Sequence, residues 1–336
     1  MTSPSGKRLI AIDALRGVAA FAVVLYHYTG KFAAFNEDPT VLGFVPAYGF
    51  AGVFLFFVIS GFCIHMRWTK GGEVRFKEFW FRRWRRLYPA YVVTLLLFLP
   101  ASTGVYDIVM HLLMLHNLDS ATVYSMNGVL WTLAIEEQLY LLYFLLLWMR
   151  KRWDWGTTIL ICLLARFVWF GVSAIVYELT AFDLPAHEGA LANWWIWALG
   201  AVSVEAYYGK ITLPSWHYSL LLSAGAFAIA AFMHFGAYRW GWGIFFEPLF
   251  WGAGSYFLLN RVMKAKWNSR IVGIAAFIGL FSYSLYLTHE FVFQYVYYLG
   301  IPACLLFAYL FYLVLEKPFI NKPVSSVELN NKATAG

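Results

Sequence analysis

Long apolar runs recur along almost the whole chain, and they limit its possible folds more than any other feature. A bilayer core of ~30 Å is crossed by about 20 apolar residues in a helix. We predict spans at residues 9–29, 46–66, 84–101, 129–149, 157–178, 190–208, 216–235, 241–260, 275–297 and 302–315. The sequence therefore predicts an all-α, polytopic membrane protein with about ten transmembrane helices. The apolar segment 105–117 is too short to span, and we expect it to lie at the interface or to re-enter.

Composition supports one membrane domain. Only 13% of the 336 residues are charged and 61% are hydrophobic, whereas a soluble domain carries about 25% charged residues. We see no internal repeat or linker, so we predict a transmembrane domain at 1–320 and a mobile cytoplasmic tail at 321–336. The three cysteines lack C-x-x-C spacing, so the sequence predicts neither a disulfide framework nor a metal site.

The basic residues orient the chain, because short cytoplasmic loops collect Lys and Arg. If both termini are cytoplasmic, most of the 25 basic residues fall in cytoplasmic segments. The opposite face then holds only Lys31 and Arg239, together with the acidic residues Glu37, Asp38, Asp107, Asp119, Asp183 and Glu188. The net charge of +7 is thus explained by topology, and no nucleic-acid partner is predicted.

The first span, IAIDALRGVAAFAVVLYHY, carries three ionisable residues. Arg16 and His27 are eleven positions apart, so they share one helix face and lie ~16 Å apart along the axis. Asp13 lies one turn below Arg16, where it can pair with the guanidinium. Such groups cost ~2.5–3.5 kcal/mol each in a membrane and usually mark a pathway or site. The alternative is a core histidine beside an ion pair that only stabilises packing.

Other spans carry matching polar groups. Glu136 and Glu137 are adjacent and therefore about 100° apart on a helix, so at most one points straight into a shared cavity. Their depth resembles that of His27, and a histidine oriented by a carboxylate is a suitable general base for a hydroxyl proton. His289-Glu290 and Arg166 also lie within spans and need partners. The alternative role for all of these residues is polar contact between helices.

An arginine cluster, FRRWRRLYP, begins the third span on the cytoplasmic side. Guanidinium groups suit phosphate oxygens, and the spacing places two pairs at i,i+3. These pairs are Arg82 with Arg85 and Arg83 with Arg86. Positive-inside anchoring or contact with anionic membrane lipids would also explain the cluster.

Six blocks in register resemble the acyltransferase 3 family of integral membrane O-acyltransferases. They run in order from residue 8 to about 320: D-x-L-R-G with the R-x10-H spacing, GVFLFFVISGF, FRRWRRLYP, LWTLAIEEQLY, FSYSLYLTHE and LEKPF. Two positions depart from the family pattern. Thr132 stands where serine is common, and Phe54 replaces an acid, which puts any acceptor-specific role of that position in doubt.

The resemblance implies an O-acyltransferase in the bacterial inner membrane. It implies transfer of an acyl group, usually acetyl, from cytoplasmic acyl-CoA to a hydroxyl of a cell-surface or lipid-linked carbohydrate at the outer face. His27 would be the essential histidine and Arg16 its paired arginine, and the arginine cluster would contact the CoA phosphates. Glu136 and Glu137 lie in a family block and are catalytic candidates. His289, at another block position, and Asp13 are candidate substrate contacts.

Several alternatives stay open. The acceptor is a small molecule in some family members, and a lipid acceptor is also possible. A transporter or flippase would place charges at mid-depth too, but would be favoured by paired repeats that are not apparent. Either direct transfer or an acyl-histidine intermediate fits His27. Some relatives continue into a soluble SGNH-type domain, and we expect this chain to act without one or with a separate partner.

Overall fold

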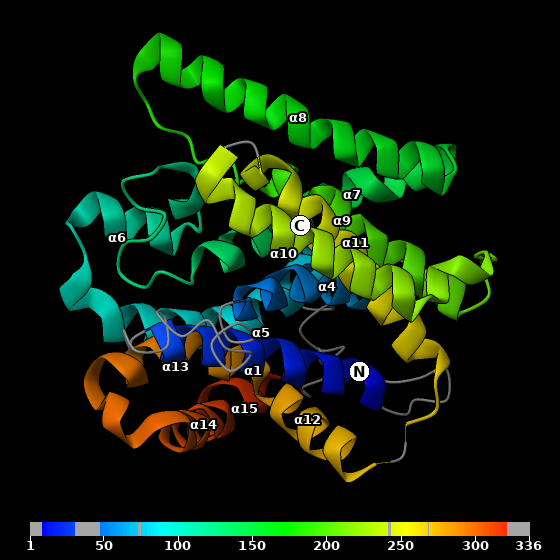
Figure 1. Cartoon of the computed structure of the whole chain (residues 1–336). Helices are drawn as coiled ribbons and strands as arrows, with labels where there is room; N and C mark the ends of the chain where they lie inside the picture. The colour runs from blue at the N-terminus through cyan, green and yellow to red at the C-terminus, as the bar shows by residue number, and fades with distance from the viewer. Residues whose placement is uncertain (1–8, 31–47, 73–74, 241–242, 268, 321–336) are drawn as a thin grey trace, which may run out of the picture.

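The computed structural model describes residues 9–30, 48–72, 75–240, 243–267 and 269–320, and these residues form helices without strands (Figure 1). The α-helices are α1 Ile10–Gly30, α4 Gly52–Thr69, α5 Phe76–Phe98, α6 Val105–Leu112, α7 Trp131–Arg152, α8 Trp155–Thr180, α9 Ala190–Tyr207, α10 Leu220–Trp240, α11 Gly243–Lys264, α12 Arg270–Leu280, α13 Ser282–Val296, α14 Gly300–Phe311 and α15 Lys317–Ile320. The predicted tail 321–336 lies outside the described residues, as do Lys31, Glu37 and Asp38.

The all-helical class is confirmed, and the helices support a multi-pass membrane protein. Among the described residues, five segments are long and apolar enough to cross a membrane: Ile10–Gly30, Gly49–Thr69, Trp131–Arg152, Trp155–Thr180 and Gly300–Ile320. The bent pair α12 and α13 makes six if it is counted as one span. The ten-span topology and the cytoplasmic location of both termini remain predictions. The segment 105–117 contains the eight-residue α6, which is too short to span.

The span predicted at 275–297 is not a single straight helix. The segment is instead two helices, α12 and α13, whose axes differ by 74°. At the break, the hydroxyl of Ser282 donates to the carbonyl of Gly279 at 3.1 Å, in competition with the backbone ladder. The bend turns α13 toward the end of α1.

A close crossing holds α1 against α12. A Cβ atom on Gly17 would lie 1.9 Å from the carbonyl oxygen of Ala275, and one on Gly279 would lie 1.8 Å from that of Asp13. Only glycine permits such backbone contact, as in other close membrane-helix pairs. The crossing fixes α1 at its Arg16 end, while α13 and α4 also pack on this helix.

Arg166 connects the outlying helix α8, which lies along one side of the molecule in Figure 1, to the rest of the fold. Its side chain is fully buried and donates to the carbonyls of Ala192 at 2.9 Å and Phe245 at 2.8 Å. The guanidinium also lies 4.5 Å from the ring centroid of Phe170. These contacts engage both terminal nitrogens, whereas the buried Nε atom has no hydrogen-bond partner among the described residues. The two carbonyl contacts tie α8 to neighbouring helices.

Candidate active site

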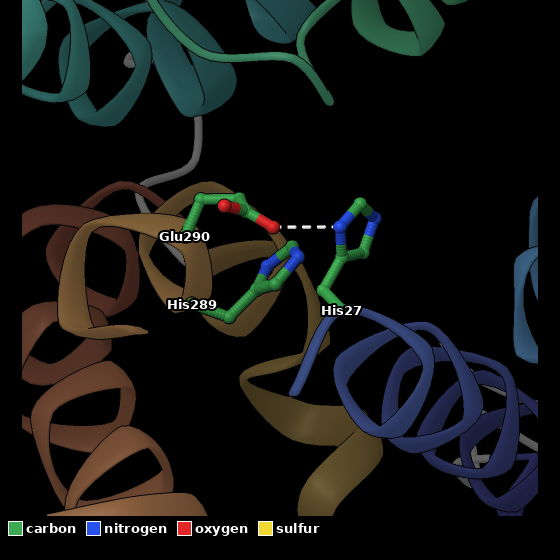
Figure 2. A group of neighbouring side chains, drawn as sticks. All are labelled: His27, His289 and Glu290. Atoms are coloured by element: carbon green, nitrogen blue, oxygen red, sulfur yellow. Dashed lines mark ion pairs between the residues drawn. The ribbon is translucent and has the colours of Figure 1, made fainter. Parts of the chain in front are cut away.

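The end of α1 and the middle of α13 bring two histidines and a glutamate together (Figure 2). His27 Nδ1 lies 2.6 Å from Glu290 Oε1, and the ring centroids of His27 and His289 are 5.1 Å apart. His27 and Glu290 are partly exposed, with side-chain exposures of 26% and 16%, whereas His289 is fully buried. The carboxylate that orients His27 is therefore Glu290.

This arrangement assigns the protons on both rings. An ionised carboxylate only accepts hydrogen bonds, so in the neutral form of His27 the proton lies on Nδ1 and Nε2 has a lone pair. His289 Nδ1 lies 3.1 Å from the carbonyl of Leu285, which also only accepts. The Nε2 atom of His289 is buried and has no hydrogen-bond partner among the described residues. A neutral His289 therefore presents a second lone pair to the site.

The same three side chains each offer one ligand atom within 4.8 Å of the others, a donor set that could hold a metal ion. Two ligands at 2.0–2.2 Å from a tetrahedral ion lie roughly 3.3 Å apart. The 2.6 Å between His27 and Glu290 is a hydrogen-bond distance instead. The arrangement described here is thus that of an acid–base pair, and these two side chains would have to separate to admit a metal.

A second part of the site is a cavity of about 100 Å³ around the other end of the α1 polar face. We call it the arginine cavity, because Arg16, Arg83 and Arg86 line it together with Ser60, Glu136 and Tyr286. Tyr286 connects the two parts, since its ring also lies 5.8 Å from that of His289. Its hydroxyl donates to Val129 O at 3.1 Å and accepts from Thr132 at 2.8 Å. Arginines at one end and an acid–base pair at the other thus flank Tyr286.

The four clustered arginines divide by helix face. Arg83 and Arg86, three residues apart, line the arginine cavity. Arg82 instead pairs with Glu78 at 2.7 Å, and Arg85 lies 6.0 Å from the ring centroid of Phe81. Neither Arg82 nor Arg85 is on the cavity wall, so only one of the two predicted i,i+3 pairs faces the cavity.

Arg86 is held by an acid that the sequence analysis left without a role. Glu316 is fully buried at the end of a π-helical turn, Tyr312–Glu316, in the LEKPF block. It accepts from Arg86 at 3.3 Å and from the hydroxyl of Ser284 at 2.9 Å. Such π-helical turns are frequent at functional sites. Glutamates in the last two sequence blocks were the available signals for both Glu316 and Glu290.

The two adjacent glutamates of α7 do not pair with His27, which corrects the expectation from their depth. Glu136 lines the arginine cavity and accepts from Tyr140 at 3.2 Å, while Glu137 is not among the lining residues. The physical reason is that two residues at the same depth in the membrane can lie on helices that are not neighbours. At His27 the helix that packs beside α1 is α13. Asp13 is buried at the α12 crossing and is likewise not on the cavity wall.

A comparison with protein families decides the identity. A family model described as an acyltransferase domain, Acyl_transf_3, matches residues 9–315. The chain belongs to the acyltransferase 3 family. The prediction of an acyltransferase is thereby confirmed.

Relatives of this acyltransferase 3 chain are named for O-acetyl transfer. The peptidoglycan O-acetyltransferase OatA of Listeria monocytogenes is 27% identical over 341 residues, which cover 86% of this chain and 50% of that protein. A Staphylococcus aureus (strain COL) protein named as a candidate O-acetyltransferase is 24% identical over 384 residues, covering 94% and 58%. The chain thus spans about half the length of these relatives. No solved structure matches it.

Proposed function

We propose that this protein is a membrane O-acetyltransferase that joins a cytoplasmic acyl-CoA donor to a carbohydrate hydroxyl at the outer face of the bacterial inner membrane. The observation that carries the proposal is the hydrogen-bonded pair of His27 and Glu290, at the opposite end of the α1 polar face from Arg16. Family membership and the names of the relatives support acetyl transfer to a glycan.

His27 supplies the base in this proposal. Its Nε2 atom removes the proton of the acceptor hydroxyl, and the ionised Glu290 stabilises the resulting imidazolium. The acceptor oxygen attacks the thioester carbonyl carbon, the carbon–sulfur bond breaks, and the CoA thiolate recovers the proton. An acyl-histidine formed on His27 remains the other route to the same products.

The arginine cavity would hold the donor. Arg16, Arg83 and Arg86 present three guanidinium groups in one small space, and Glu136 together with Glu316, which pairs with Arg86, offsets only part of their charge. Guanidinium groups bind phosphates in charge-assisted hydrogen bonds. The phosphates of CoA would stay at this end, while the slender pantetheine arm carries the thioester past Tyr286 toward His27.

Carbohydrate O-acetylation is tested in a strain that lacks the protein. Complementation with wild type is expected to restore ester-linked acetate on surface glycans, detected by mass spectrometry and NMR. His27→Ala at an equal membrane level is expected to restore none. Identical glycans in all strains would contradict a carbohydrate acceptor, and the same analysis of lipids and secreted small molecules would then identify another acceptor.

A further inference from the structure

A second, larger cavity of about 700 Å³ opens beside the ends of α4, α7 and α9. Its lining includes Trp68 and the charged residues Arg75, Arg150, Lys151, Glu205 and Lys210. Four of these five charges are positive. No step of the proposed reaction uses these residues, and the arginine cavity contains none of them.

The single acid of this second cavity, Glu205, already accepts hydrogen bonds from donors of the protein itself. Glu205 is 1% exposed and accepts from Arg150 Nη2 at 2.9 Å, from Trp155 Nε1 at 2.8 Å and from His65 Nε2 at 3.0 Å. These partners satisfy the carboxylate within the protein, and its charge is balanced by Arg150. The lysines Lys151 and Lys210 therefore leave the cavity with a positive field.

Arg150 is also fixed in place. Both its Nε and Nη2 atoms bond to Glu205, and its guanidinium lies 5.2 Å from the ring centroid of Trp155. A guanidinium held in this way is organised before a ligand arrives, which lowers the ordering cost of binding. Trp68 adds an aromatic wall, on which a planar group can stack.

Two helices, α4 and α7, line both the arginine cavity and the second cavity, at different positions along their lengths. On α4, Trp68 lies one turn beyond Ile64, and on α7, Leu147 lies two turns beyond Tyr140. The displacement along these helices is about 6–10 Å, toward the side that we predict to be cytoplasmic. A ligand in the second cavity would thus lie outside the donor cavity on the donor side.

We propose that the second cavity binds the phosphate groups of an anionic ligand. Such groups occur on the adenosine 3′-phosphate of CoA, beyond the diphosphate that the arginine cavity would hold, and on the headgroup of an anionic lipid. The nucleotide source rests on the proposed use of acyl-CoA, whereas the lipid source does not. In both cases, Lys151 and Lys210 contribute charge and Arg150 contributes an oriented guanidinium.

The test compares Lys151→Glu/Lys210→Glu with a matched control, Arg261→Glu/Lys266→Glu, whose exposed residues are outside both cavities. Each protein is placed in phosphatidylcholine nanodiscs and titrated with 3′,5′-ADP. Reversal of two charges in the cavity is expected to weaken binding about tenfold, with a dependence on salt. Binding needs no turnover, so His27→Ala should bind like wild type even if the proposed reaction is wrong.

A second arm measures co-purifying phosphatidylglycerol by native mass spectrometry. Weaker nucleotide binding in the cavity variant alone identifies the donor as the source of the phosphates. Unchanged nucleotide binding with loss of bound phosphatidylglycerol in that variant identifies a lipid headgroup. If both ligands bind equally well to the cavity variant and the control, the proposal is overturned.

Discussion

At the scale of single residues, the proposed role of His27 depends on Glu290. Glu290 holds the imidazole through Nδ1 and, in the proposed reaction, leaves Nε2 available as a base. We expect Glu290→Gln to keep the side-chain volume but to remove the charge that stabilises the imidazolium. The rate of acyl transfer at saturating substrates should fall by about 10²–10⁴-fold.

The matched control for this substitution is Glu178→Gln, which changes an exposed carboxylate on α8. Turnover should be unaffected there. Near-normal turnover in Glu290→Gln, with membrane levels equal to wild type, would show that the carboxylate does not assist His27.

Glu316 is expected to act on the donor through Arg86. Glu316→Gln retains an acceptor for Ser284 but loses the ion pair with Arg86. The KM for acyl-CoA should rise about tenfold because a charge-assisted contact worth roughly 1.5–3 kcal/mol no longer orients the arginine. Turnover at saturation should change less.

Ser284→Ala provides the comparison, since it removes the other bond to Glu316 and leaves Arg86 paired. An equal rise of KM in both variants would indicate general loosening around Glu316 rather than a misplaced Arg86.

Positions of side chains could be predicted where they depend only on the periodicity of one helix. The α1 face that carries Arg16 and His27 is such a case, because both residues lie on one helix. The partner of His27 was missed because it depends on which helices meet. Glu290 is on α13, far along the chain, and no spacing within one helix can place it beside α1.

At the scale of helices, the α1–α12 crossing is the most sensitive contact. Gly279→Ala would place a methyl group 1.8 Å from the carbonyl oxygen of Asp13, so the two backbones must separate. We expect a loss of about 1–3 kcal/mol in the free energy of unfolding, measured as a lower Tm in detergent.

Gly273→Ala is the control on the same helix. A Cβ atom at Gly273 meets nothing within 4 Å, so alanine should stabilise the helix by roughly 0.5–1 kcal/mol. Equal Tm values for the two alanine variants would contradict a close crossing at Gly279.

The short segment around α6 should respond to pH. His111 and His116 stack with ring centroids 4.0 Å apart, and burial, followed by the nearby His111, lowers the pKa of His116 to about 3 from its ordinary 6.5. The unfolded segment therefore binds a proton that the folded one excludes. Stability should be full above pH 6.5 and fall by up to about 1.4 kcal/mol per unit as the pH drops toward 3.

Hydrogen exchange of residues 105–130 between pH 7 and pH 5 measures this effect. His116→Phe keeps an aromatic ring and should remove much of the loss of protection at pH 5, after correction for intrinsic exchange. The same loss in wild type and His116→Phe would show that His116 is not the titrating group.

Helix positions were well predicted by apolar run length, but the break near Phe281 was not. The segment 275–297 is apolar on average, and its hydropathy contains no sign of a bend. The break follows from local hydrogen bonding at Gly279 and Ser282 and from packing against α1. The mean hydropathy of a segment contains neither kind of information. That bend places Glu290 beside His27.

At the scale of the whole molecule, the proposed reaction requires donor and acceptor chemistry at opposite ends of the bundle. The arginine cavity and the second cavity lie toward the side that we predict to be cytoplasmic, and the His27 pair is at the opposite end of α1. Composition predicted the helical membrane class because the chain has fewer charged residues than a soluble domain of this length carries. The acceptor was not predictable, since the sequence contains no motif that specifies one sugar.

The most direct test of the account uses sealed vesicles that contain the protein in one orientation. Isotope-labelled acetyl-CoA is supplied on the face that carries Arg83 and Arg86, and the glycan acceptor that the complementation experiment identifies is supplied on the other face. We predict labelled ester on this acceptor with wild type and none with His27→Ala. Undiminished transfer by His27→Ala, or transfer only when donor and acceptor share the outer face, would contradict acyl transfer across the membrane through His27.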